Sequence, residues 1–123
     1  MTRIFFLLGA LFGASGVAAG AFGAHLLRQR LAPEMLAVFE TGVRYQLIHA
    51  LVLLVVAWAS AHWTGSAARA AGWLFVAGVL LFSGSLYALA LSGVKWLGAI
   101  TPFGGAAFIA GWLLLAWAAF RAA

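Results

Sequence analysis

The chain has 123 residues, of which 67% are hydrophobic and only 7% are charged. Soluble domains carry about 25% charged residues, so this composition excludes an ordinary soluble protein. Cysteine is absent, which excludes disulfides, thiolate metal sites and cysteine nucleophiles. The net charge of +5 is spread over termini and loops. That distribution fits contact with anionic lipid head groups and not nucleic-acid binding, which needs a clustered basic face.

Four apolar runs, each long enough to cross a bilayer, follow one another along the chain. We therefore predict an all-α fold, a polytopic membrane protein whose single domain, residues 1–123, is a four-transmembrane-helix bundle. The expected helices are 3–27, 34–63, 69–92 and 101–121. Arg3 and the small residues near Ala19 imitate a cleaved secretory signal. The apolar stretch is long for a signal core, so we interpret it as an uncleaved first helix.

Glycines recur along the first span at alternating steps of four and three, which keeps them on one narrow seam of a helix. In lipid such a seam lets a second helix approach closely. The last span carries a shorter seam of the same kind. The residues predicted to serve helix packing are Gly9, Gly13, Gly16, Gly20, Gly23, Gly104 and Gly111.

The connection after the first span begins a new helix, because Pro33 suits a first helical position and Glu34 suits the positive end of the helix dipole. Residues 34–43 either lie on the membrane as a short interfacial helical segment before helix two or continue into it. A continuous helix to Trp63 would be about 45 Å long, against a hydrocarbon core of about 30 Å. We expect it to protrude, tilt or bend, with the bend at Gly42.

Three further signals concern the last span, the orientation in the membrane and the membrane boundary. Thr101 and Pro102 read as the N-cap and first residue of the last helix. By one positive charge, the loops favour an orientation with both termini outside. Most tryptophans are expected at one membrane face as an aromatic belt, with Trp96 opposite. The predicted belt consists of Trp58, Trp63, Trp73, Trp112 and Trp117.

The densest group of polar residues lies at the start of the second span. Glu40 with Arg44, and Tyr45 with His49, are spaced at i, i+4 and so share helix faces. Ionisable groups at membrane depth face a bundle interior or a water-filled cavity. The candidates for a polar or ligand-binding cluster are His25, Glu40, Arg44, Tyr45, Gln46, His49, Ser83, Ser85 and Tyr87.

Two interpretations of this cluster stay open. In the functional one, His49, Glu40, Arg44 and Tyr45 handle a proton or a ligand, and His25 joins them from the same membrane side. In the structural one, the cluster is an interhelical hydrogen-bond network that fixes the bundle, in which a neutral histidine donates to a carbonyl. The structural interpretation is favoured, because intramembrane ionisable groups act functionally only where a pathway exists.

The sequence predicts no catalytic residue, metal site or cofactor. His25, Glu40 and His49 are allowed zinc ligands, but no local pair has metal-binding spacing. Ser83 and Ser85 have no activating base beside them, and aspartate is absent. No phosphate-cradling loop or dinucleotide fingerprint is present, because the glycines lie within apolar helices and follow no strand.

Four motifs in order resemble one known family. They are Gly20-Ala-Phe-Gly-Ala-His25, the stretch Phe39–His49, Phe82-Ser-Gly-Ser-Leu-Tyr87 and, in the last span, Ile100-Thr-Pro-Phe-Gly-Gly105 with Gly111-Trp112. Together they resemble the small integral membrane family called domain of unknown function 423 (transmembrane protein 256-like). The resemblance implies a four-helix, multi-pass protein of the bacterial inner (plasma) membrane and implies no established reaction. Leu26 stands where many relatives are expected to have glycine.

These observations predict an integral membrane protein that is non-enzymatic and has a structural or accessory role, packing through glycine-rich helix faces. The alternative is a small oligomeric transporter or channel with a polar site around His49, Arg44 and Tyr45. The expected partners are membrane lipids and either further copies of the chain or a larger membrane complex.

Overall fold

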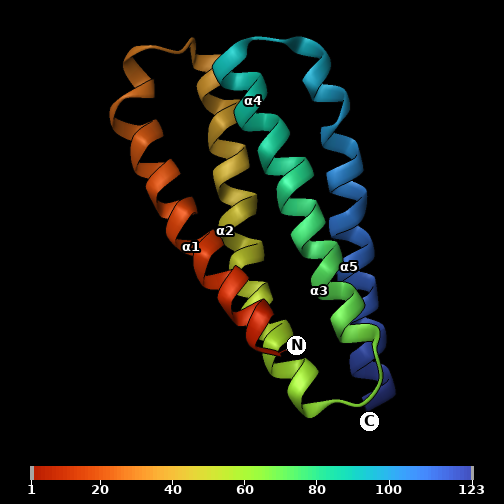
Figure 1. Cartoon of the computed structure of the whole chain (residues 1–123). Helices are drawn as coiled ribbons and strands as arrows, with labels where there is room; N and C mark the ends of the chain where they lie inside the picture. Colours follow the sequence, from red (N-terminus) through yellow and green to blue (C-terminus); the bar gives the residue numbers. More distant parts are fainter. Residues whose placement is uncertain (1, 123) are drawn as a thin grey trace.

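The computed structural model describes residues 2–122, which form helices and turns and no strand (Figure 1). Within them, four helical spans are long and apolar enough to cross a membrane. This confirms the predicted four-helix membrane bundle. The elements are α1 (Thr2–His25), the 3-10 helix η1 (Leu27–Gln29), α2 (Pro33–His62), α3 (Ala67–Gly78), the π-helix η2 (Val79–Ser83), α4 (Gly84–Ser92), the 3-10 helix η3 (Lys95–Ala99) and α5 (Thr101–Ala122).

α2 is the central helix of the bundle. α1 packs along it on one side, and α3, η2 and α4 pack against it on the other, where α5 lies against α3 and η2. α2 is accordingly the most buried of the four spans and α1 the least. The two termini lie at the same end of the bundle (Figure 1). Polar side chains on α2 therefore meet neighbours on two different sides.

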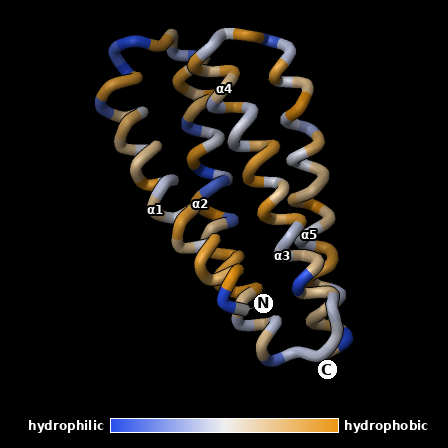
Figure 2. Tube along the Cα trace, viewed as in Figure 1, coloured by the Kyte–Doolittle hydropathy of each residue, from blue (hydrophilic) through white to orange (hydrophobic). Residues whose placement is uncertain are grey.

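Hydrophilic residues gather at the ends of the bundle, and further hydrophilic positions lie within α2 (Figure 2). Outside α2, the buried residues are apolar except for Ser83 and Ser85. Phe5, Leu53, Val56 and Phe75 are fully buried in the main core. Glycine makes room for the larger rings: a Cβ at Gly72 would lie 2.5 Å from the Phe5 ring. Close packing between helices, rather than polar attraction, thus forms most of the interior.

α2 runs without interruption from Pro33 through Gly42 to His62. Residues 34–43 are therefore its first turns, and of the two expected arrangements the structure has the one in which they continue into helix two. The only short helical piece between the first two spans is η1. Gly42 makes a close contact between helices, because a Cβ there would lie 2.8 Å from the Tyr87 ring. Its lack of a side chain brings α4 close to α2.

The third span is interrupted at its middle by η2, where the backbone takes a π-helical turn between α3 and α4. It ends at Gly93, whose φ of 74° is left-handed and whose N–H donates to the Leu89 carbonyl at 2.8 Å. This is a glycine C-cap. Thr101 begins α5 as its first residue, and its hydroxyl pairs with Ser85 Oγ at 2.6 Å. The threonine predicted as a cap thus links two helices.

Candidate functional site

Gln46 and His49 are the deepest polar side chains of α2, at 5% and 3% exposure. They lie near the midpoint of this 30-residue helix, about 20 Å from either end. Since they are three residues apart, they occupy neighbouring positions on the helix surface. Each nevertheless belongs to a different hydrogen-bond cluster with a different set of helices.

The His49 cluster joins α2 to α5. The His49 Nδ1 atom lies 2.7 Å from the Tyr45 carbonyl, and the Trp112 indole N–H points at Nε2 over 3.1 Å. A carbonyl only accepts and an indole only donates, so the imidazole is neutral with its hydrogen on Nδ1. The Phe108 ring stacks on it, with ring centres 3.7 Å apart and planes 6° from parallel. Neither ring nitrogen is left for a metal or an incoming proton.

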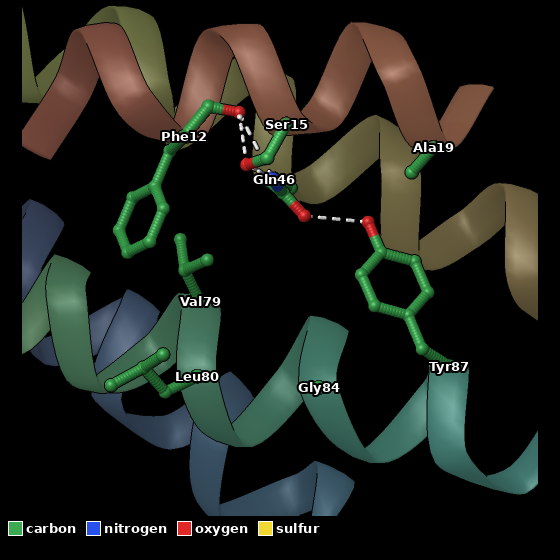
Figure 3. A pocket seen from close by; sticks show the side chains of 8 residues that line it. All are labelled: Phe12, Ser15, Ala19, Gln46, Val79, Leu80, Gly84 and Tyr87. Atoms are coloured by element: carbon green, nitrogen blue, oxygen red, sulfur yellow. Dashed lines mark hydrogen bonds between the residues drawn. The ribbon is translucent and has the colours of Figure 1, made fainter. Parts of the chain in front are cut away.

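The Gln46 cluster joins α1, α2 and α4 (Figure 3). The amide nitrogen donates to the Phe12 carbonyl at 2.9 Å and to Ser15 Oγ at 2.8 Å. The amide oxygen accepts from the Tyr87 hydroxyl at 2.6 Å. Ser15 in turn donates to the Leu11 carbonyl at 2.8 Å. The Gln46 side-chain amide thereby links both α1 and α4 to the central helix α2.

A pocket of about 270 Å³ lies beside this second cluster. Its rim residues Ser15, Leu80 and Gly84 are exposed, so it opens at the lipid-facing side of the bundle rather than at an end. Figure 3 shows the hollow between α1 and the helix that carries Gly84 and Tyr87. The lining residues are Phe12, Ser15, Ala19, Gln46, Val79, Leu80, Gly84 and Tyr87.

The π-helical turn η2 forms part of this pocket, through Val79 and Leu80. π-turns inside α-helices are rare and are frequent at functional sites. Ser83, at the end of the turn, donates to the Gly42 carbonyl at 2.7 Å. On the opposite side α5 approaches closely, since a Cβ at Gly104 would lie 2.7 Å from Phe82 Cα. The turn is therefore held by α2 and α5 together.

The charged residues predicted for the cluster lie elsewhere. His25, Glu40 and Arg44 are exposed toward one end of the bundle. Glu40 and Arg44 line a separate hollow between α1 and α2. Within residues 2–122, no three histidine or glutamate side chains come close enough to hold a metal ion. The structure thus brings Gln46 and Tyr87 together, Ser85 to Thr101 and Ser83 to Gly42, and leaves Arg44 apart from His49.

The glycine seam of α1 faces α2 within the same chain. A Cβ at Gly9 would lie 2.8 Å from the Ala50 carbonyl, and one at Gly16 would lie 2.7 Å from the Leu47 side chain. Gly20 and Gly23 approach Val43 and Phe39 in the same way, and Gly111 approaches Phe75. Gly13 differs, because no atom lies within 4 Å of its Cβ position. The seam forms the α1–α2 pair.

Sequence reasoning missed three of the contributors to these clusters. Trp112 was expected in an interfacial belt, but it lies midway along α5 and donates to His49, so that expectation is corrected. Phe108 carried no polar signal. Ser15 was the one polar residue within residues 4–24 of the first span, and that alone marked it. Ser60 is a separate case, since its buried hydroxyl has no hydrogen-bond partner.

Comparison with known proteins gives a consistent result. Residues 19–105 match DUF423, described as a protein of unknown function. The chain is 45% identical over 94 residues to the UPF0382 membrane protein YwdK of Bacillus subtilis, covering 76% of each. It is 46% identical over 93 residues to the UPF0382 membrane protein SH2409 of Staphylococcus haemolyticus, covering 76% of this chain and 75% of that one. No solved structure matches.

Proposed function

Because this chain belongs to the DUF423 family, whose bacterial members compared above are named as membrane proteins without a stated activity, we propose that it is a non-enzymatic structural or accessory protein. It is a multi-pass integral membrane protein with four apolar spans. Its partners in this proposal are membrane lipids and either further copies of itself or a larger membrane complex.

The observation that carries the proposal is the hydrogen bonding of His49. This residue is the deepest ionisable group of α2, and both of its nitrogens are bonded within the chain. A general base or a metal ligand needs a free nitrogen lone pair. Because its nitrogens are hydrogen-bonded to the Tyr45 carbonyl and the Trp112 indole, the His49 imidazole instead links α2 to α5, as a structural group does.

The remaining polar groups support the same conclusion. Ser83 and Ser85 have their hydroxyls bonded across helices, to Gly42 and Thr101. A serine nucleophile needs an activating base, and the hydrogen bonds of these serines involve none. A transport site of His49, Arg44 and Tyr45 receives no support either, because Arg44 is exposed while His49 is closed in by aromatic rings.

The test is native mass spectrometry of the protein extracted gently from its own membrane. We expect the chain to appear with further copies of itself or with a different protein at fixed stoichiometry. A bare monomer under conditions that preserve known membrane complexes would contradict the accessory role.

A matched pair of variants shows where such an assembly forms. Val17 on α1 and Ile109 on α5 are exposed to 64% and 63% and point outward from opposite sides of the bundle. Val17→Trp should disrupt the assembly if α1 carries the contact, and Ile109→Trp if α5 does. The variant that leaves the assembly intact is the control for folding.

A further inference from the structure

We propose that the pocket beside Gln46 binds an apolar, bilayer-soluble molecule that carries a hydroxyl group, with the hydroxyl on Gln46 and Tyr87 and the hydrocarbon against Phe12 and Leu80. This goes beyond the accessory role, because it needs no partner protein. The proposal rests on the hydrogen-bond inventory of the pocket, its depth, its walls and its open side.

The inventory gives the chemistry of the ligand. Every hydrogen of the cluster is already donated within the protein: two from the Gln46 amide, one from Ser15 and one from Tyr87. An amide oxygen has two lone pairs, and Gln46 Oε1 accepts one bond; the Tyr87 oxygen keeps its own lone pairs. What remains free is acceptor capacity only. The pocket therefore selects a ligand that brings a donor.

Depth restricts the ligand further. Gln46 lies near the midpoint of α2, about 20 Å from either helix end. Phospholipid head groups lie at the bilayer surface and do not descend to this depth. A hydroxyl on a hydrocarbon reaches this depth more easily, because few polar groups have to leave water. Two sources bring a hydroxyl donor on a hydrocarbon: a long-chain or isoprenoid alcohol, with one hydroxyl, and the reduced form of a quinone, with two on one ring.

The walls fit a hydrocarbon. Phe12, Ala19, Val79 and Leu80 surround the polar floor. Small-molecule sites of about 300–1,000 Å³ hold whole ligands, so a pocket of about 270 Å³ encloses the hydroxyl and the first carbons. The rest of the chain lies in the bilayer through the open side.

Gly84 keeps the pocket open. No atom lies within 4 Å of the position where its Cβ would be, although the residue lines the pocket directly. A side chain there would project into free space without disturbing a neighbour. Gly84→Leu is therefore expected to fill the site while leaving the bundle folded.

The experiment compares two probes that differ by one hydrogen-bond donor. The protein is placed in lipid nanodiscs, and binding of farnesol and farnesyl methyl ether is measured by native mass spectrometry. We expect one farnesol per chain and at least about tenfold weaker binding of the ether, which can only accept. Decylubiquinol and decylubiquinone form a second pair. Preference for farnesol identifies an alcohol site, and preference for the quinol identifies a quinol site.

Three variants locate the binding. Gly84→Leu should abolish it. Gly13→Leu is the matched control, because its Cβ also meets open space but it lines a separate apolar hollow with Leu47 and Leu51. Gln46→Leu removes the amide acceptor and frees the Tyr87 hydroxyl to donate to an ether oxygen, so it should reduce the alcohol-to-ether ratio.

Two results would overturn the proposal outright, and a third would contradict its placement at this pocket. One is equal binding of alcohol and ether to the wild-type protein, which would mean that the pocket takes any hydrocarbon, including lipid acyl chains. The other is unchanged farnesol binding in Gly84→Leu with a wild-type unfolding temperature. Loss of binding in Gly13→Leu as well as Gly84→Leu would also count against the site.

Discussion

The two polar clusters of α2 differ in what covers them. His49 faces α5, where Phe108 stacks on the ring and Trp112 completes its hydrogen bonds. Gln46 faces α1 and α4, which meet it through hydrogen bonds but leave a pocket of about 270 Å³ beside it. Two residues one turn apart thus become a closed structural contact and the floor of an open pocket. The difference arises from the surrounding helices and not from the residues themselves.

The largest expected difference comes from adding one methyl group on the closed side, at Gly104, and one on the open side, at Gly84. At Gly104, on the closed side, a Cβ would lie 2.7 Å from Phe82 Cα, which is backbone and cannot move aside. Gly104→Ala should lower the free energy of unfolding by about 1–3 kcal/mol. Gly84→Ala, on the open side, should be neutral or raise it by up to about 1 kcal/mol.

Thermal unfolding in detergent micelles measures both. Gly105→Ala is the control, because its Cβ would make an ordinary contact 3.9 Å from the Phe82 ring. Equal losses of stability in Gly104→Ala and Gly84→Ala would remove the distinction between a closed and an open side.

The next largest effect is expected when His49 and Gln46 are each replaced with leucine. His49→Leu leaves the Trp112 indole N–H without its acceptor in a packed interior, which costs about 1–3 kcal/mol. Gln46→Leu should cost less, because Tyr87 and Ser15 border a pocket with room to reorient. Denaturation by graded addition of SDS compares the two variants. A greater loss for Gln46→Leu would show that the pocket side carries more of the stability.

A smaller effect concerns the α1 seam. Gly16→Ala brings a Cβ to 2.7 Å from the end of the Leu47 side chain, which is flexible, so the expected cost is about 1 kcal/mol. Gly13→Ala meets open space and should cost nothing. The same SDS titration measures this pair. Identical behaviour of the two variants would mean that the seam does not fasten α1 to α2.

The smallest effect is expected at Ser83, whose hydroxyl donates to the Gly42 carbonyl at 2.7 Å. Interhelical hydrogen bonds in membrane proteins contribute about 0.6 kcal/mol on average. Ser83→Ala should lower stability by about that amount and leave η2 in place, since α5 also holds it. Hydrogen exchange of the backbone around Phe82 detects any release of the turn, and faster exchange there would contradict this expectation.

Several features of the fold could be predicted from the sequence because they depend on local or compositional physics. Apolar runs of span length predict the four helices, since a bilayer demands internally bonded backbone. Pro33 predicts the start of α2 because its missing N–H is harmless there. Gln46, His49 and Tyr87 stood out as polar residues inside apolar spans, which is a property of the sequence alone.

The partners of those residues could not be predicted in the same way. Trp112 has the residue type of an interfacial anchor, and only its depth in α5 places it on His49. Gly13 and Gly16 belong to one seam in the sequence, yet one meets open space and the other meets Leu47. A repeat fixes which face of a helix carries a residue but not what lies opposite.

By itself, then, the sequence determined a four-helix membrane protein with small residues on its contact faces and a few polar groups at depth. The tertiary structure alone decided that Gln46 borders a pocket while His49 is closed in. It also decided that η2 and Gly84 shape that pocket. The reason is physical: helix formation depends on neighbours along the chain, whereas a cavity depends on how side chains from three separate helices fill the space between them.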